Sequence, residues 1–119
     1  MPKLTIKVSI KNKENKSDLI TIATVDNNEI KYKEEDKTLV TYDYRKQILK
    51  RENKEIKMIY NFDKDKSTKG YVKIKDLNEI IALNIKTHKI EKNKNNILIN
   101  YSTEDNNFFY EIEEIKWVY

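Results

Sequence analysis

The sequence predicts an all-β domain that closes as an antiparallel meander barrel of about eight to ten strands. Along most of the 119 residues, apolar side chains recur at every second position, which is typical of strands with one buried face. Short polar clusters separate these runs, and connections this short join antiparallel neighbours. A meander with one apolar face removes its exposed edges by closing on itself. A two-sheet sandwich is the alternative arrangement.

The alternation is clearest in the middle of the chain, where Ile56-x-Met58-x-Tyr60-x-Phe62 marks one face of a strand. These residues are mostly β-branched or aromatic, as strands prefer. In chain order we expect strands over 4–11 (Leu4, Ile6, Val8, Ile10), 19–25, 29–34 (Ile30, Tyr32), 39–44 (Val40, Tyr42, Tyr44), 46–51, 55–62, 67–74, 80–90, 97–103 (Ile97, Ile99, Tyr101) and 108–119.

Turns are predicted where asparagine, aspartate and lysine cluster between these runs. Gly70 is the single glycine. We therefore expect asparagine and aspartate to supply the left-handed backbone positions that tight hairpins demand. The expected turns are Asp26-Asn27-Asn28, Glu52-Asn53-Lys54, 63–66, 92–96 and 105–107.

The segment 76–85 also fits a short helix, because Asp76 and Glu79 have the spacing of a capping box and Leu77, Ile80, Ile81 and Ile85 form a helical stripe. A strand is the preferred interpretation. Several of these residues are β-branched, and Ile81, Leu83 and Ile85 alternate with polar or small neighbours.

The last segment changes its apolar parity between Ile112 and Ile115. One extra residue in a strand shifts the parity in this way, so the sequence predicts a β-bulge near Glu113.

Composition excludes several classes of site. The chain has no cysteine, which removes disulfides, thiolate zinc sites and cysteine nucleophiles. The start of the chain alternates where a signal peptide needs an unbroken apolar run, and the longest apolar run, 80–83, is far too short to span a membrane. We therefore expect a soluble, cytoplasmic protein without membrane association.

The formal net charge of +4 and the pI near 9.0 suggest nucleic acid as a partner. However, the 22 lysines are spread along every segment and interleaved with acidic residues, whereas a nucleic-acid interface needs a basic stripe or block. Nucleic acid is therefore a possible partner but not the favoured one.

Residues 29–103 combine several short patterns in a fixed order: Ile30-x-Tyr32-x-Glu34-Glu35, Ile48 with Arg51, Ile56-x-Met58-x-x-x-Phe62, Gly70-Tyr71, Thr87-x-x-Ile90 and Ile97-x-Ile99-x-Tyr101. In these features the segment resembles the YwiB-like family of small bacterial proteins of unknown function. The resemblance implies a calycin-type, lipocalin-like barrel and transfers no activity. Where the family tends to have a Pro-x-Gly turn after the Gly-Tyr strand, this chain has Lys75-Asp76-Leu77-Asn78.

No catalytic or metal-binding residue is predicted, and no cofactor is expected. His88 is the only histidine, and the Gly-x-Ser-x-Gly elbow of serine hydrolases is missing. Asp63-x-Asp65-x-Ser67 is similar to the start of a calcium loop, but Thr68 and Ile74 occupy the positions that need glycine and glutamate. Glu111, Glu113 and Glu114 are expected on the outside of the last strand.

A ligand site is expected in the lumen or at the mouth of the barrel. Arginine is rare in this chain, and Arg51 could pair with Glu34 at the mouth. The chain has eight tyrosines, and those expected on strands could line the lumen and turn their hydroxyl groups toward a ligand: Tyr32, Tyr42, Tyr60, Tyr71, Tyr101 and Tyr110. The predicted ligand-binding residues are Tyr32, Glu34, Tyr42, Arg51, Met58, Tyr60, Tyr71 and Tyr101.

The favoured function is a non-enzymatic binding module that holds a small amphipathic molecule or a segment of another protein. A nucleic-acid-associated barrel is the first alternative, and a hydrolase or isomerase that uses Glu34, His88 or Arg51 is the second. We expect a monomer or a homodimer.

Overall fold

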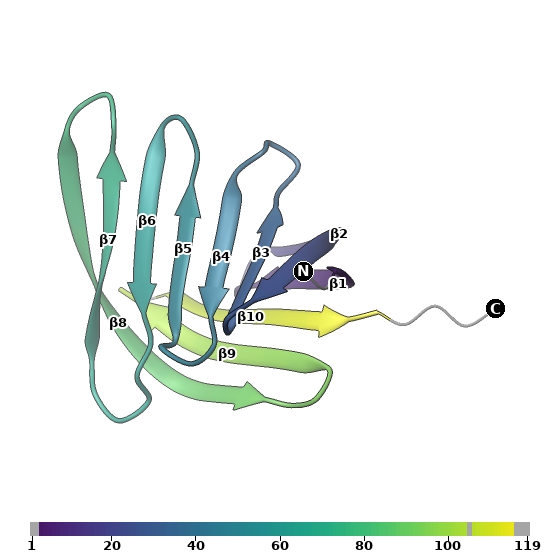
Figure 1. Cartoon of the computed structure of the whole chain (residues 1–119). Coiled ribbons are helices and arrows are strands. Elements are labelled where there is room, and N and C mark those ends of the chain that lie inside the picture. Colours follow the sequence, from purple (N-terminus) through teal and green to yellow (C-terminus); the bar gives the residue numbers. More distant parts are fainter. Residues whose placement is uncertain (1–2, 105, 116–119) are drawn as a thin grey trace.

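The computed structural model describes residues 3–104 and 106–115, and within them ten strands close into one antiparallel barrel (Figure 1). Each strand pairs with the next along the chain, and β1 pairs with β10, which confirms the predicted closed meander. No helix long and apolar enough to cross a membrane occurs in these residues. The strands are β1 (Lys3–Lys11), β2 (Lys16–Asp26), β3 (Glu29–Lys33), β4 (Leu39–Asp43), β5 (Ile48–Glu52), β6 (Ile56–Asn61), β7 (Thr68–Ile74), β8 (Glu79–Lys92), β9 (Asn96–Thr103) and β10 (Asn106–Glu114).

The core fills the barrel with the inward residues of the strands. In β9, for example, Ile97, Ile99, Tyr101 and Thr103 are buried while the residues between them are not. This period of two is the alternation that the sequence displays. The buried apolar residues are Ile6, Val8, Ala23, Ile30, Tyr32, Val40, Tyr42, Leu49, Met58, Phe62, Ile85, Ile97, Ile99, Tyr101, Tyr110 and Ile112.

The segment 76–85 is not helical. Residues 75–78 form a turn in which the Asn78 amide donates to the Lys75 carbonyl oxygen at 3.3 Å, and Asn78 has a φ of 51°. Strand β8 begins at Glu79 and pairs with β7 from Ile74 onward. The predicted strand is therefore confirmed.

The predicted bulge near Glu113 is wrong. The register of β10 runs without a shift from Asn106 to Glu113 against β9 and as far as Glu114 against β1. The strand ends at Glu114, so the parity change in the sequence falls after its end. Residues 116–119 of the predicted strand 108–119 lie outside the described residues. The one register shift recorded for β8 lies between Thr87 and Lys89.

Asparagine supplies only part of the left-handed backbone positions. Asn27, Asn28 and Asn78 have positive φ as expected, but so do Lys37, Gln47 and Glu104, which the composition did not indicate. The turn hydrogen bonds hold two of these residues: the Lys37 amide donates to Glu34 O at 2.9 Å, and the Gln47 amide donates to Asp43 O at 2.7 Å. Backbone hydrogen bonding there outweighs the cost of left-handed geometry.

Gly70 is required by a close approach and not by its backbone angles. A Cβ atom at this position of β7 would lie 2.7 Å from both Ile85 Cδ1 and Tyr60 Cδ1. The Tyr60 ring therefore packs over the glycine on the inner face of the sheet, a use of glycine that is common within strands.

Candidate functional site

A cavity of about 210 Å³ lies inside the barrel, toward the end that carries the turn between β3 and β4. Four tyrosines and one arginine give it polar walls, and aliphatic and aromatic residues complete it. We call it the tyrosine cavity. Its lining consists of Ile10, Tyr32, Val40, Leu49, Arg51, Met58, Tyr60, Tyr101, Thr103, Phe108 and Tyr110.

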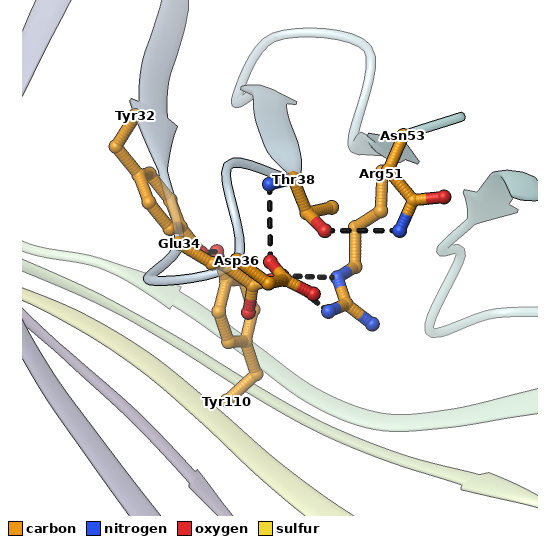
Figure 2. Close-up of polar contacts among 7 residues, drawn as sticks. All are labelled: Tyr32, Glu34, Asp36, Thr38, Arg51, Asn53 and Tyr110. Atoms are coloured by element: carbon orange, nitrogen blue, oxygen red, sulfur yellow. Dashed lines mark hydrogen bonds and ion pairs between the residues drawn. The ribbon is translucent and has the colours of Figure 1, made fainter. Parts of the chain in front are cut away.

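Tyr32 and Tyr110 meet across the barrel from β3 and β10, as Figure 2 shows. Their hydroxyl groups are hydrogen-bonded at 2.6 Å, and either can be the donor. Burial raises the pKa of both phenols, that of Tyr110 most strongly. Both therefore remain neutral at physiological pH and act as hydrogen-bonding groups inside an apolar interior.

Aromatic contacts fix the rings that form the cavity wall. The Tyr101 ring lies 5.0 Å from Phe62, 5.3 Å from Phe108 and 6.1 Å from Tyr60, measured between ring centroids. Edge-to-face and stacked pairs at these distances add to the stability of a core beyond simple burial. The aromatic rings therefore support one another on the side of the cavity that Tyr101 forms.

Arg51 lies where the tyrosine cavity reaches the surface. Its Nε donates to Glu34 Oε1 at 3.1 Å, and its Nη2 donates to the same oxygen (Figure 2). Burial disfavours the guanidinium charge, but the Glu34 carboxylate outweighs this effect, and the net pKa of Arg51 is raised. The same charge opposes the burial that raises the pKa of Tyr60 and Tyr101. Arg51 is thus a fixed positive charge beside the phenols.

Polar side chains tie the β3–β4 turn to the β5–β6 turn around Arg51. Asp36 Oδ1 accepts from the Thr38 amide at 3.1 Å, and Thr38 Oγ1 accepts from Asn53 Nδ2 at 3.1 Å (Figure 2). Hydrogen bonds from Thr38 hold the pKa of the Asp36 carboxyl below its ordinary value. The arrangement fixes the mouth of the cavity.

A second cavity of about 150 Å³ lies at the opposite end, beside the β8–β9 hairpin. We call it the aliphatic cavity, because Leu4, Ile6, Val25, Ile30, Ile97 and Ile112 form most of its inner wall. Lys92 Nζ lies 4.7 Å from the centre of the Tyr44 ring at its rim. We place the candidate site in the tyrosine cavity, since buried hydroxyl groups and a fixed charge converge only there among the described cavities of the interior.

The structure brings five of the eight predicted site residues together, because Tyr32, Arg51, Met58, Tyr60 and Tyr101 all line the tyrosine cavity. Whether they bind a ligand stays a prediction.

The other three predicted residues lie elsewhere. Glu34 pairs with Arg51 but lies outside the lining. Tyr42 is 1% exposed and packs in the core, and Tyr71 is 45% exposed on the outer face of β7, where it pairs with Ala82.

Sequence reasoning did not single out Ile10, Val40, Leu49, Thr103 or Phe108 as site residues. The alternation in the sequence predicted that some of these residues face the interior. It does not predict at which position along the barrel axis a cavity remains. The partnership of Tyr32 with Tyr110 spans 78 positions, and no local pattern signals it.

His88 does not line the tyrosine cavity. It is exposed on β8, and its Nε2 lies 2.6 Å from Ser102 Oγ on β9. No carboxylate contacts the ring among the described residues, so the pair lacks the orienting acid of a catalytic triad. The described residues also contain no group of three or more His, Asp or Glu side chains that could hold a metal ion.

Comparisons with known proteins bear on the fold. No protein-family model matches the sequence, and no curated protein matches it either. The crystal structure of the YwiB protein from Bacillus subtilis is similar: the superposition has a TM-score of 0.57 at 18% identity and covers 96% of this chain and 91% of that one. At this identity the likeness establishes the fold alone, and the chain therefore folds as a YwiB-like barrel.

Proposed function

We propose that the protein is a non-enzymatic binding module that holds a small amphipathic molecule in the tyrosine cavity. The observation that carries the proposal is the cavity of about 210 Å³ among four tyrosines and Arg51. An apolar cavity of roughly 150 Å³ admits benzene. The space here therefore suits one ring or a short alkyl chain.

The polar part of the ligand would lie near Arg51, where the cavity meets solvent. Because Glu34 already neutralises the guanidinium, a neutral hydrogen-bonding head group fits better than a second carboxylate or an ammonium group. The apolar part would contact Leu49, Met58 and Phe108. A calycin-like mode of binding, with the ligand inside the barrel, agrees with this placement.

The test uses hexanol, hexanoate and hexylamine as probes in a titration followed by amide chemical shifts. We expect saturable shifts at the residues of the tyrosine cavity, largest for hexanol. Absence of saturable shifts, or shifts confined to the aliphatic cavity, would contradict the proposal.

A matched pair of variants sharpens this test. Ile10→Trp fills the tyrosine cavity and should abolish hexanol binding, whereas Ile22→Trp adds the same side chain at an exposed position of β2 and should not. Equal loss of binding in both variants would place the probe elsewhere. Native mass spectrometry of protein purified from its own host then identifies any natural ligand that co-purifies, and reports whether the protein is a monomer or a homodimer.

A nucleic-acid-binding function is the second candidate, and one observation favours it. Tyr71 is exposed on β7 between Lys69 and Lys73, and Lys57 pairs with Lys73 on the neighbouring strand. An exposed aromatic ring among lysines is a stacking platform for single-stranded nucleic acid. Fluorescence anisotropy with labelled single-stranded RNA and DNA would test it: binding should fall steeply with salt and with Tyr71→Ala, and no association at low salt rules it out.

A further inference from the structure

Strand β2 is paired along only part of one edge. On one side it pairs with β1 over nine positions, from Lys16 to Thr24. On the other side it pairs with β3 only through Thr24, Val25 and Asp26. Figure 1 shows the two strands diverging from their shared hairpin. Among the described residues, no strand pairs with residues 16–23 on the β3 side.

The turn geometry identifies which backbone groups face this free edge. Asn27 and Asn28 both have positive φ, as in a two-residue hairpin of type I′, so Asp26 and Glu29 form the hydrogen-bonded closing pair. Hydrogen-bonding direction alternates along a strand. The N–H and C=O groups of Asp18, Ile20 and Ile22 therefore point toward the free edge.

This edge lacks most of the features that protect edge strands. It has no proline and no recorded register shift, and charged residues occur only at its start, at Lys16 and Asp18. Ile20 and Ile22 are 58% and 62% exposed on the outer face of the same strand. Exposed apolar residues beside free backbone groups are what an added strand would cover.

A cleft of about 300 Å³ separates the free edge from the β3–β4 turn. We call it the lateral cleft; its lining consists of Ser17, Asp18, Leu19, Glu34, Glu35, Asp36 and Arg51. Four of these residues are acidic and one is basic, and the basic one is already paired with Glu34. In a chain with a formal net charge of +4, this cleft is locally acidic and selects a cationic occupant.

We propose that the free edge of β2 docks an extended, lysine- or arginine-bearing segment of a partner protein. The segment pairs with the backbone of Asp18, Ile20 and Ile22 and places its cationic side chains opposite Glu35 and Asp36. A second copy of this chain fits less well, because a two-fold pairing of β2 edges brings two acidic turns to the same seam.

The experiment uses a capped hexapeptide that alternates lysine and valine, with a glutamate–valine hexapeptide as the charge control. Amide chemical shifts of the labelled protein should move at Asp18, Ile20 and Ile22 with the lysine peptide, and their exchange with solvent should slow. The glutamate peptide should not bind. No shift with the lysine peptide, shifts confined to other strands, or equal binding of both peptides overturns the proposal.

Two variants separate the backbone from the charge contribution. Ile20→Pro removes a backbone N–H that faces the free edge and does not pair with β1. This variant should bind the lysine peptide about tenfold more weakly. Glu35→Lys reverses a charge of the lateral cleft and should weaken binding of the lysine peptide about fivefold. Glu113 is an exposed glutamate of β10, and Glu113→Lys should leave this affinity unchanged. If Ile20→Pro does not fold, Glu35→Lys against Glu113→Lys still decides the matter.

Sedimentation velocity of the protein alone provides the competing outcome. A concentration-dependent dimer in wild type that is lost in Ile20→Pro would assign the edge to a second copy and overturn the proposal, whereas a monomer leaves the edge available to a partner segment.

Discussion

The two ends of the barrel interior differ in how they fill the same kind of space. At the aliphatic end, Ile6, Ile97 and Ile112 are buried and need no hydrogen-bond partner. At the tyrosine end, Tyr32 and Tyr110 are equally buried and satisfy each other's hydroxyl groups. The same alternating pattern thus produces two different ends. Apolar packing stabilises the aliphatic end, whereas the buried hydroxyl groups of the tyrosine end need specific hydrogen-bond partners.

This difference explains why function is proposed at only one end. A purely aliphatic cavity offers shape without orientation, whereas hydroxyl groups and a fixed charge can orient a ligand. The phenols also make the tyrosine end sensitive to pH, to the loss of single hydroxyl groups and to crowding.

Alkaline pH should destabilise the protein mainly through its buried tyrosines. Burial raises the folded-state pKa of Tyr32, Tyr42, Tyr101 and Tyr110 above the value of about 10 expected for unfolded tyrosine. Their stabilising contribution is therefore complete below about pH 10 and is lost as the pH rises toward the folded pKa, by roughly 1.4 kcal/mol per tyrosine and pH unit.

Urea unfolding at about pH 8 and about pH 11, followed by circular dichroism, measures this loss. The double variant Tyr32→Phe with Tyr110→Phe removes two of the titrating groups, so its stability should fall less between the two pH values. An equal fall in both proteins would mean that other groups cause the alkaline effect.

Two truncations on the same strand compare the ends directly. Ile6 is 1% exposed at the aliphatic end, whereas Ile10 is only partly buried beside the tyrosine cavity. Ile6→Ala should lower the free energy of unfolding by about 2–5 kcal/mol, and Ile10→Ala by clearly less. Chemical denaturation of both variants measures the difference; similar costs would show that the cavity is not empty in solution.

Adding a side chain at Gly70, next to the tyrosine cavity, should also destabilise the protein. A Cβ atom here meets Tyr60 and Ile85, so Gly70→Ala should lower the free energy of unfolding by about 1–3 kcal/mol. Ile85→Val removes the Cδ1 atom that would clash, so Gly70→Ala should cost less in that background. A double-mutant cycle from urea melts gives the coupling, and simple additivity would contradict the close approach.

Loss of one hydroxyl from the pair Tyr32–Tyr110 should lower the free energy of unfolding by about 1–2 kcal/mol. The remaining hydroxyl stays buried away from water and loses its hydrogen-bond partner. Tyr32→Phe and Tyr110→Phe should therefore each destabilise the protein, and the double variant should cost less than their sum. Thermal unfolding of the three proteins is sufficient to test this. A double variant as costly as the sum would indicate that each hydroxyl acts separately.

The smallest effect is expected at the rim of the aliphatic cavity. Lys92→Met removes the cation that lies over the Tyr44 ring and should lower the free energy of unfolding by about 0.5–1 kcal/mol. Lys86→Met, at an exposed position of the same strand, should be nearly neutral. If both lysine variants behave alike in thermal unfolding, the contact contributes nothing to stability.

Much of the fold was predictable because strand structure is encoded locally. Ile81, Leu83 and Ile85 alternate as a strand, and the structure agrees, since β-branched side chains outweigh one capping-box spacing. The C-terminal parity change was misread as a bulge, because alternation does not mark where pairing stops. The left-handed positions at Lys37 and Gln47 were missed, because turn hydrogen bonds hold them there and residue type does not indicate them.

The candidate site was predictable only in part. Inward parity predicted that Tyr32, Met58, Tyr60 and Tyr101 face the barrel interior, and all four line the tyrosine cavity. The same reasoning favoured Tyr71, which lies on the outer face because its strand is anchored by Gly70 against Tyr60. A one-residue difference in register turns a side chain to the opposite face.

The strands, most turns and the closed meander could be predicted from the sequence, because each depends on alternation or turn chemistry within a short stretch, and the pairing of Arg51 with Glu34 was one possibility among others. The tertiary structure alone decided which tyrosines meet, where the interior stays empty and which part of β2 lacks a neighbour. These features depend on the height of each strand in the barrel and on where β2 and β3 diverge, and both are set by packing between residues far apart in the chain.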